Sequence, residues 1–232
     1  MTKPIFITAT DTDAGKTYFA AALTHALVAA GFKTAVYKPI SAGCEEKTDP
    51  QGNKQLINQD ALLLQQQANC QQGIKEINPI AFKAAIAPHI AAKKLQQTIS
   101  LTQIETGFEV CYQQQSDYII CEGAGGWRLP LGKKLFLSDF VKATQQQVIL
   151  VVNIKLGCLN HALLTFESIK SDGLTCIAWV ANYPEATAEN LSYIYDNIAE
   201  LCDLLPMPLL AKLPYQKDIS LAAEQINLAL LT

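Results

Sequence analysis

Hydrophobic residues in this chain gather in short, almost uninterrupted runs, separated by longer segments with helical spacing. The apolar runs are residues 5–7, 34–37, 118–121, 148–152, 176–180 and 208–210. They do not alternate with polar residues, which is typical of strands covered by helices on both faces. Helical spacing covers residues 16–30, 59–68, 102–115, 160–172 and 187–202. This alternation predicts an α/β fold with a doubly wound, mostly parallel sheet, helices on both of its faces, and ligands at the carboxyl ends of its strands.

The length and the charge favour one domain that does not bind nucleic acid. The chain has 232 residues, so we expect a single domain over residues 1–232 with a full hydrophobic core. Its net charge is −3 and Arg128 is its single arginine, whereas binding to a phosphate backbone needs a clustered basic face. The polar stretch 44–58 contains Asp49-Pro50-Gln51-Gly52, which predicts a turn in a surface loop.

The cysteines and the apolar runs point to a soluble, cytoplasmic protein. Seven cysteines without a C-x-x-C pair indicate neither a zinc site nor a disulfide framework, so we expect reduced thiols. The chain passes from Met1-Thr2-Lys3 directly into a strand, and no apolar run reaches the ~18 residues of a membrane span. We therefore expect no membrane association.

The segment TATDTDAGKTYF, residues 8–19, has the end of a phosphate-binding loop. In such a loop, backbone N–H groups and a helix N-terminus bind the anion, the lysine reaches the outer phosphates, and the hydroxyl binds Mg²⁺. Gly15, Lys16 and Thr17 fit these roles, but Thr10 stands where the usual spacing has its first glycine. The strand before the loop and the helix after it favour a phosphate site; the alternative is an ordinary N-capped helix with a chance Gly-Lys-Thr.

Three further charged residues are expected near the edge of the sheet where the parallel strands end. Glu122 closes the strand 118–121 and opens Gly123-Ala124-Gly125-Gly126, so its carboxylate is a candidate ligand of Mg²⁺. Asp60 begins a helix and is either a second such ligand or only a helix cap. Lys38 ends the second strand; it either faces the same crevice as Lys16 or is a solvated residue at a strand end. We expect both lysine side chains to be exposed in the unliganded crevice, and together they imply an anionic substrate besides the nucleotide.

These motifs occur in the order found in one enzyme family. The stretches TDTDAGKT, YKPI, NQDALLL, NPIAF, APH, CEGAGGWRLPL, VNIKLGCLNHALLT, WVAN and PLLAKLP resemble the dethiobiotin synthetases, from residue 5 to about residue 215. The resemblance implies a P-loop NTPase-like fold and a homodimer with active sites shared at the interface. It also implies that ATP, Mg²⁺ and CO₂ or bicarbonate are used to close a ureido ring on 7,8-diaminopelargonic acid.

Carried over by position, the resemblance assigns roles to particular residues of this chain. Lys16 and Lys38 are the expected catalytic lysines, and Thr17, Asp60 and Glu122 are the expected ligands of Mg²⁺. Asn182 is expected to contact adenine. Beyond these, the residues expected at ATP are Asp13, Ala14, Gly15, Tyr18, Gly123, Ala124, Gly125, Leu213, Pro214 and Tyr215, and those expected at diaminopelargonate, besides Lys38, are Ser41, Ala42, Gly157, Cys158 and Asn160.

The chain departs from the family pattern at three places. Ala9 stands where the loop usually begins with glycine, which is tolerable if Ala9 keeps a negative φ. Ser41-Ala42-Gly43 reverses the expected order of small residues, and Tyr183 replaces an acidic residue after Asn182. None of these departures removes a charged catalytic group.

Residues 155–161 allow two interpretations. The resemblance directs Gly157, Cys158 and Asn160 toward the substrate of a partner subunit. Without it, Gly157 is only a turn residue, and Asn160 only caps a helix that begins at Ala162.

Two other functions agree with part of this pattern but not with all of it. A nucleotide switch of the partition or septum-site ATPase type shares the fold, but positions 9–14 contain no lysine and residues 222–232 have no basic face. A cobyrinate-type amidotransferase synthetase needs a glutaminase domain, for which 232 residues leave no room.

Overall fold

Six parallel strands form the central sheet of the computed structural model, which describes residues 2–48 and 52–231. Their order is β12-β11-β10-β1-β7-β2. All six apolar runs are therefore confirmed as strands of one sheet. The strands are β1 (Lys3–Ala9), β2 (Thr34–Tyr37), β7 (Tyr118–Glu122), β10 (Gln147–Asn153), β11 (Cys176–Tyr183) and β12 (Leu209–Pro214).

The five segments with helical spacing are also confirmed, with shifts at two starts. They are α1 (Lys16–Ala29), α2 (Gln59–Gln67), α5 (Leu101–Tyr112), α7 (Cys158–Ser171) and α8 (Leu191–Leu204). Helix α8 begins later than predicted because Thr187 N donates to Asn190 Oδ1 at 2.7 Å, which holds residues 187–190 in a turn before the helix. Helix α7 begins earlier because Gly157, at φ +90°, is its N-cap.

Several short elements gave too few residues for a periodic signal in the sequence. Four are helices, one is a 3₁₀ turn, and the others are strands in two-stranded sheets. They are α3 (Ile74–Ile77), α4 (Pro88–Lys94), α6 (Leu137–Ala143), α9 (Ile219–Ala223), η1 (Leu228–Leu230), β3 (Ile40–Ser41) with β6 (Ile80–Ala81), β4 (Glu45–Thr48) with β5 (Lys54–Ile57), and β8 (Pro130–Gly132) with β9 (Leu135–Phe136).

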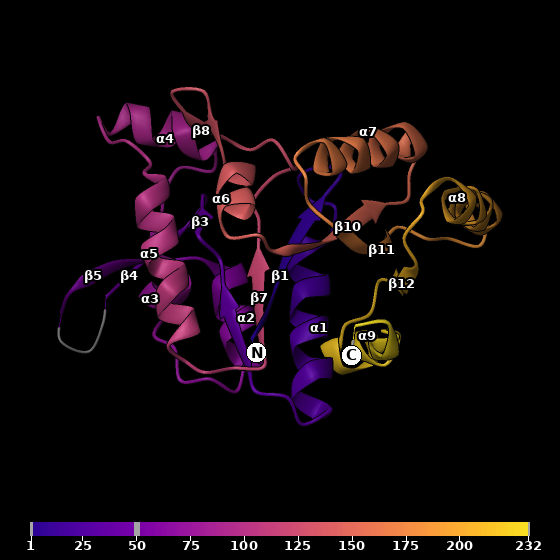
Figure 1. Ribbon diagram of the computed structural model, residues 1–232, viewed down its shortest axis with the longest axis horizontal. Helices are drawn as coiled ribbons and strands as arrows, with labels where there is room; N and C mark the ends of the chain where they lie inside the picture. The colour runs from indigo at the N-terminus through magenta and orange to yellow at the C-terminus, as the bar shows by residue number, and fades with distance from the viewer. Residues whose placement is uncertain (1, 49–51, 232) are drawn as a thin grey trace.

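The predicted surface loop at 44–58 is largely a hairpin. Strands β4 and β5 pair in antiparallel fashion, and the hairpin projects to one side of the molecule (Figure 1). Most of its side chains are exposed, so hydrophobic burial gave no strand signal there. Of the predicted turn at 49–52, residues 49–51 lie outside the described part of the chain.

Helices cover both faces of the sheet, as predicted (Figure 1). Alternate strand residues face opposite sides: Ile5 and Ile7 pack in the core beneath α1, α2 and α9, whereas Phe6 packs in the core beneath α5 and α6. Strands β10 and β11 also pack against α7 and α8 through Leu150 and Trp179. This double covering explains why the strands are almost wholly apolar.

The strand order decides which strand ends become neighbours. β7 lies between β1 and β2 in the sheet, although it begins only at Tyr118, long after β1 ends at Ala9 and β2 ends at Tyr37. Ile7 of β1 pairs with Glu122, and Tyr37 of β2 pairs with Cys121. Glu122 is therefore flanked by the loop that follows β1 and by Lys38, the residue that follows β2.

Candidate active site

The loop after β1 leads directly into α1 and has the geometry of an anion site. Asp13 and Gly15 have positive φ values of 56° and 93°. Gly15 is the N-cap of α1 and makes no side-chain cap hydrogen bond, so the first N–H groups of the helix remain available to an anion. The alternative of an ordinary helix with a side-chain N-cap is therefore wrong.

Ala9 meets the condition set for replacing the usual glycine. It is the last residue of β1, fully buried, and the positive φ values in this loop fall instead on Asp13 and Gly15. Close approach is needed at Gly15, where an added Cβ would lie 2.2 Å from Asn182 Nδ2. Aspartate tolerates the left-handed region better than most residues, which explains how Asp13 fits the turn.

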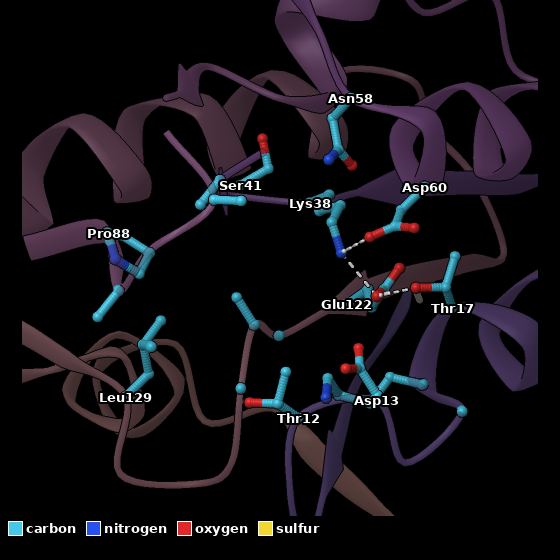
Figure 2. A pocket seen from close by; sticks show the side chains of 18 of the residues that line it. Thr12, Asp13, Thr17, Lys38, Ser41, Asn58, Asp60, Pro88, Glu122 and Leu129 are labelled. Carbon is cyan, nitrogen blue, oxygen red and sulfur yellow. Dashed lines mark hydrogen bonds and ion pairs between the residues drawn. The ribbon is translucent and has the colours of Figure 1, made fainter. Parts of the chain in front are cut away.

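Lys16 and Lys38 converge on the same site, but both are buried, contrary to our expectation. Lys16 is 7% exposed and donates from Nζ to the backbone oxygen of Asp11 at 3.1 Å. Lys38 is 3% exposed, and its ammonium lies 2.6 Å from Glu122 Oε1 and 3.1 Å from Asp60 Oδ2 (Figure 2). The interpretation of Lys38 as a solvated strand-end residue is wrong: it is the counter-ion of two carboxylates.

Glu122 lies at the centre of this cluster and has spare hydrogen-bonding capacity. Its side chain is 1% exposed, and Oε1 accepts from Thr17 Oγ1 at 2.7 Å as well as from Lys38 (Figure 2). Its other oxygen, Oε2, is buried and accepts no hydrogen bond from any residue that the structure describes. A buried acceptor without a donor is costly, which indicates that a ligand completes the site.

Asp60 is not a helix cap. The N-cap of α2 is Asn58, whose side chain accepts from Ala61 N at 3.2 Å. Asp60 lies in the first turn and directs its carboxylate at Lys38, with 44% of its side chain exposed. It can therefore serve either the lysine or a bound cation.

The two lysines respond differently to burial. Burial lowers the pKa of Lys16 from its ordinary value; the charge of Glu122 opposes this effect, and that of Lys38 adds to it. Burial alone would also lower the pKa of Lys38, but the carboxylates of Glu122 and Asp60 outweigh it and raise that pKa. Lys38 is thus held firmly as an ammonium ion.

These groups line a cavity of about 810 Å³ at the carboxyl ends of the strands. One end is charged, and the other is apolar, with Pro88 and Leu129 in its wall (Figure 2). Of the predicted site residues, the cavity brings together Asp13, Gly15, Lys16, Thr17, Tyr18, Lys38, Ser41, Ala42, Asp60, Glu122, Gly123, Ala124 and Gly125; Ala14 is fully buried beneath the loop.

The cavity also contains residues to which we had assigned no role. They are Thr12, Asn58, Ala85, Ile86, Ala87, Pro88 and Leu129. Pro88 occupies the first turn of the seven-residue helix α4, and a proline after a short apolar run is the signal that could have marked this wall. Ser41 donates to Asn78 Oδ1 at 2.7 Å, so its hydroxyl already has a partner beside the cavity.

The residues expected at adenine lie beside the loop, outside this cavity. Asn182 pairs with Leu213 between β11 and β12, and its Nδ2 donates to the backbone oxygen of Ala14 at 3.0 Å. Tyr18 Oη donates to the backbone oxygen of Gln216 at 3.2 Å, which ties α1 to the segment after β12. Leu213 is buried, Pro214 is half-buried and Tyr215 is 69% exposed.

Gly157, Cys158 and Asn160 lie apart from the cavity of their own chain. Gly157 is the N-cap of α7 and needs its positive φ of 90°; Asn160 is inside the first turn, so the interpretation of Asn160 as a cap is wrong. Gly157 and Asn160 are exposed, whereas Cys158 is buried and donates from Sγ to Asn197 Oδ1 at 3.6 Å.

The described residues, 2–48 and 52–231, include no helix long and apolar enough to cross a membrane. Within the same residues, no group of three or more His, Cys, Asp or Glu side chains could hold a metal ion. The seven cysteines are free thiols. A cation at this site would therefore have to rely on two carboxylates, a hydroxyl and groups from its ligand or solvent.

Comparisons with solved structures agree with this fold. The septum site-determining protein MinD from Pyrococcus horikoshii, complexed with Mg-ADP, gives a TM-score of 0.55 at 18% identity, over 97% of this chain and 87% of the other. A ParA family ATPase from Chlorobium tepidum gives 0.53 at 15% identity, over 98% and 92%. At these identities the likeness shows the fold alone.

The fold and the loop define a P-loop NTPase-type α/β domain, and a family described as an AAA domain matches residues 3–223. ATP-dependent dethiobiotin synthetases are 45% identical in Aeromonas salmonicida, over 93% of this chain and 92% of the relative, and 40% identical in Pseudomonas aeruginosa, over 97% and 95%. The chain belongs to the ATP-dependent dethiobiotin synthetase family.

Proposed function

We propose that this protein is an ATP-dependent dethiobiotin synthetase of biotin biosynthesis. It converts 7,8-diaminopelargonic acid, CO₂ and ATP into dethiobiotin, ADP and phosphate. The observation that carries the proposal is the convergence of Lys16, Lys38 and Glu122 in one cavity, in a chain so similar to known synthetases. The apolar end of the cavity suits the alkyl chain of the substrate, and the charged end suits its reacting groups.

Ring closure needs three bond-forming steps and no protein nucleophile. An amine of the substrate attacks CO₂ and loses a proton, which gives a carbamate. A carbamate oxygen attacks the γ-phosphorus of ATP, and ADP leaves. The second amine then attacks the carbamoyl carbon and loses a proton, phosphate leaves, and the ring closes. Negative charge develops around the transferred phosphoryl group, so catalysis depends on positioning and on cations.

The chain supplies those cations from two sides. Lys16 lies within the phosphate loop and is bound to the Asp11 backbone oxygen, a contact that it can exchange for phosphate oxygens. Lys38 lies opposite, next to Glu122, where it can neutralise the carbamate and the γ-phosphate. The backbone from Gly123 to Gly125 forms a wall of the cavity without side chains that would obstruct close approach.

We further propose that Thr17, Asp60 and Glu122 hold Mg²⁺ directly or through its waters. Their donors are oxygens, which Mg²⁺ prefers, and the unpartnered Glu122 Oε2 provides a buried anionic site. When bound, the ion supplies charge neutralisation at the phosphates. In the structure Lys38 pairs with the carboxylates of both Asp60 and Glu122. If these carboxylates bind Mg²⁺, Lys38 has to give up part of this pairing, and its ammonium group would then be free to contact the substrate.

For the base of ATP we propose a site beside Asn182 and residues 213–215. The Asn182 amide offers both a donor and an acceptor. Its Nδ2 donates to the Ala14 backbone, whereas Oδ1 accepts no hydrogen bond from a residue that the structure describes and could accept one from an exocyclic amine. Tyr215 follows the strand that pairs with Asn182 and is 69% exposed, so its ring would be free to cover the base.

We also propose a homodimer in which the start of α7 completes the partner's substrate site. In support, Leu156 is 100% exposed and Leu164 58% exposed, on either side of the exposed Asn160. Mixed dimers test this. Lys16→Ala and Asn160→Ala chains, each inactive alone, should recover up to about a quarter of wild-type activity when randomly assorted, because one heterodimer site then carries neither defect. Verified heterodimers without activity would restrict Asn160 to its own subunit.

The experiment for the function itself is a dependence test. Phosphate release from ATP should require both diaminopelargonate and bicarbonate, and mass spectrometry should detect dethiobiotin. Phosphate release that depends on neither compound would instead favour a switch ATPase of the MinD or ParA kind.

We also propose that the enzyme acts in the cytoplasm, because its cosubstrate is ATP and its seven thiols are free.

A further inference from the structure

The carboxylate of Asp172, at the end of α7 and outside the cavity, holds the segment that follows the glycine-rich loop. Asp172, with 8% of its side chain exposed, accepts from Trp127 Nε1 at 2.9 Å and from Arg128 NH2 at 3.1 Å. The second terminal nitrogen of Arg128, NH1, lies 2.7 Å from Asp172 Oδ2. Lys142 Nζ lies 3.5 Å from Asp172 Oδ1. The single arginine of the chain is therefore used here.

Helix α7 does not itself account for a carboxylate at this position. Asp172 is the C-cap of α7, where the helix dipole disfavours negative charge. Burial alone would raise the pKa of Asp172, but the hydrogen bonds from Trp127 and Arg128 outweigh it and lower that pKa. The charge is therefore stabilised from outside the helix, mainly by Trp127 and Arg128.

Trp127 and Arg128 lie in the sequence between two segments that line the cavity. Gly123, Ala124 and Gly125 line the cavity before them, and Leu129 lines it after them. The glycine-rich loop also runs close to the end of β1 and the start of the phosphate loop, since a Cβ added at Gly126 would lie 3.5 Å from the backbone oxygen of Ala9 and 3.9 Å from that of Thr10. The loop has almost no side chains with which to hold its own shape, and Gly125 has a φ of +61°.

One further contact fixes the start of the same segment. The Trp127 ring packs edge-on against Phe6 with centroids 6.0 Å apart, and Phe6 leaves no room for a Cβ at Gly123. Phe6 therefore fixes the position of the Trp127 ring from the sheet side, whereas Asp172 fixes its indole N–H and the Arg128 guanidinium from the α7 side.

We infer that Asp172 is a positioning residue for ring closure: through Trp127 and Arg128 it fixes the glycine-rich loop and Leu129 against the reacting groups. This inference rests on the proposed function for its chemistry. Asp172 touches no substrate; it determines where the wall lies. A small displacement of the wall should misplace the phosphoryl group and the diamine relative to Lys16 and Lys38.

The test compares kinetics with stability. Asp172→Ala should lower kcat by about 10- to 100-fold, the usual effect of a misplacement near 1 Å. KM for the diamine should also rise, because Leu129 belongs to the same wall. Asp172→Asn keeps an acceptor for Trp127 Nε1 and should restore part of kcat. Asp139→Asn is the matched control: Asp139 accepts from Phe136 N at 2.9 Å and lies 4.0 Å from Lys142, but makes no hydrogen bond or ion pair with residue 127 or 128.

Two outcomes would overturn the inference. In the first, Asp172→Ala and Asp139→Asn lose equally in melting temperature and have kcat and KM values within twofold of each other. Asp172 would then have a structural role only. If Asp172→Ala does not fold, Arg128→Met serves instead, since the Arg128 side chain is 41% exposed. It should lower kcat, and Arg128→Lys should restore it; equal kcat values in both would be the second contrary outcome.

Equilibrium ATP binding separates this inference from the proposed function. If the wild type forms no dethiobiotin, the proposed function fails. ATP binding still tests the wall, because Asp172→Ala should weaken it and Asp139→Asn should not. Unchanged ATP affinity in Asp172→Ala, with wild-type kinetics, would count against the positioning role alone.

Discussion

The burial of Lys38 makes its removal a matter of stability as well as catalysis. In Lys38→Met the ammonium is lost, and Glu122, 1% exposed and 2.6 Å away, becomes a buried charge without its cation. Removing one partner of such a pair costs about 3–5 kcal/mol. We expect the low end, about 3 kcal/mol, because the Thr17 hydroxyl still donates to Glu122 and Asp60 can be hydrated. In a chain of this size that lowers the melting temperature by about 6–12 °C.

The assay is thermal unfolding of the ligand-free protein, followed by circular dichroism, beside a measurement of dethiobiotin formation. Lys38→Met/Glu122→Gln should regain most of the lost stability, since no buried charge remains, but none of the activity. Lys16→Met is the matched control: Lys16 bonds a backbone oxygen, so its loss should abolish activity with a much smaller fall in melting temperature. A Lys38→Met protein that melts within about 2 °C of wild type, or a double variant no more stable than the single one, would refute this account of the ion pair.

Three further outcomes follow from the site. Gly15→Ala should weaken ATP binding at least about tenfold, a change of about 1.4 kcal/mol, because the added Cβ would clash with the Asn182 side chain beside the phosphate loop. Gly31→Ala has a similar φ, +90°, with nothing within 4 Å of the added Cβ, so it should lose stability but bind ATP normally in the same calorimetric titration. Asp60→Asn should raise the Mg²⁺ concentration for half-maximal activity about tenfold or more; an unchanged titration would leave Asp60 with Lys38 alone. The pKa of Asp172 is lowered from 3.8, so its contribution to stability should be present above that pH and disappear as the pH falls through the lower folded value; urea unfolding of wild type and Asp172→Asn should therefore converge in acid, and a constant difference would contradict this.

The order of elements and the chemistry of the loop were readable from the sequence because both depend on near neighbours. Apolar runs and helical spacing correctly predicted the six strands of the sheet and the five longest helices. Gly15, Lys16 and Thr17 lie next to one another in the chain, so their joint position at the start of α1 follows from the strand before them and the helix after them. The short helices and small sheets contain too few residues for periodicity to predict them.

The tertiary structure decided everything that depends on which strand ends become neighbours. No local pattern states that β7 enters between β1 and β2, and it is this insertion that places Glu122 between Thr17 and Lys38. Burial follows from the same packing, so lysines that we expected to be exposed became buried, and Lys38 became the counter-ion of two carboxylates. The contact of Asp172 with Trp127 spans 45 residues, since it joins the end of one crossover helix to a loop two strands away in the sheet. A sequence determines such pairs only through the whole fold, because the free energy that brings them together comes from burying the apolar faces of strands and helices and not from the pairs themselves.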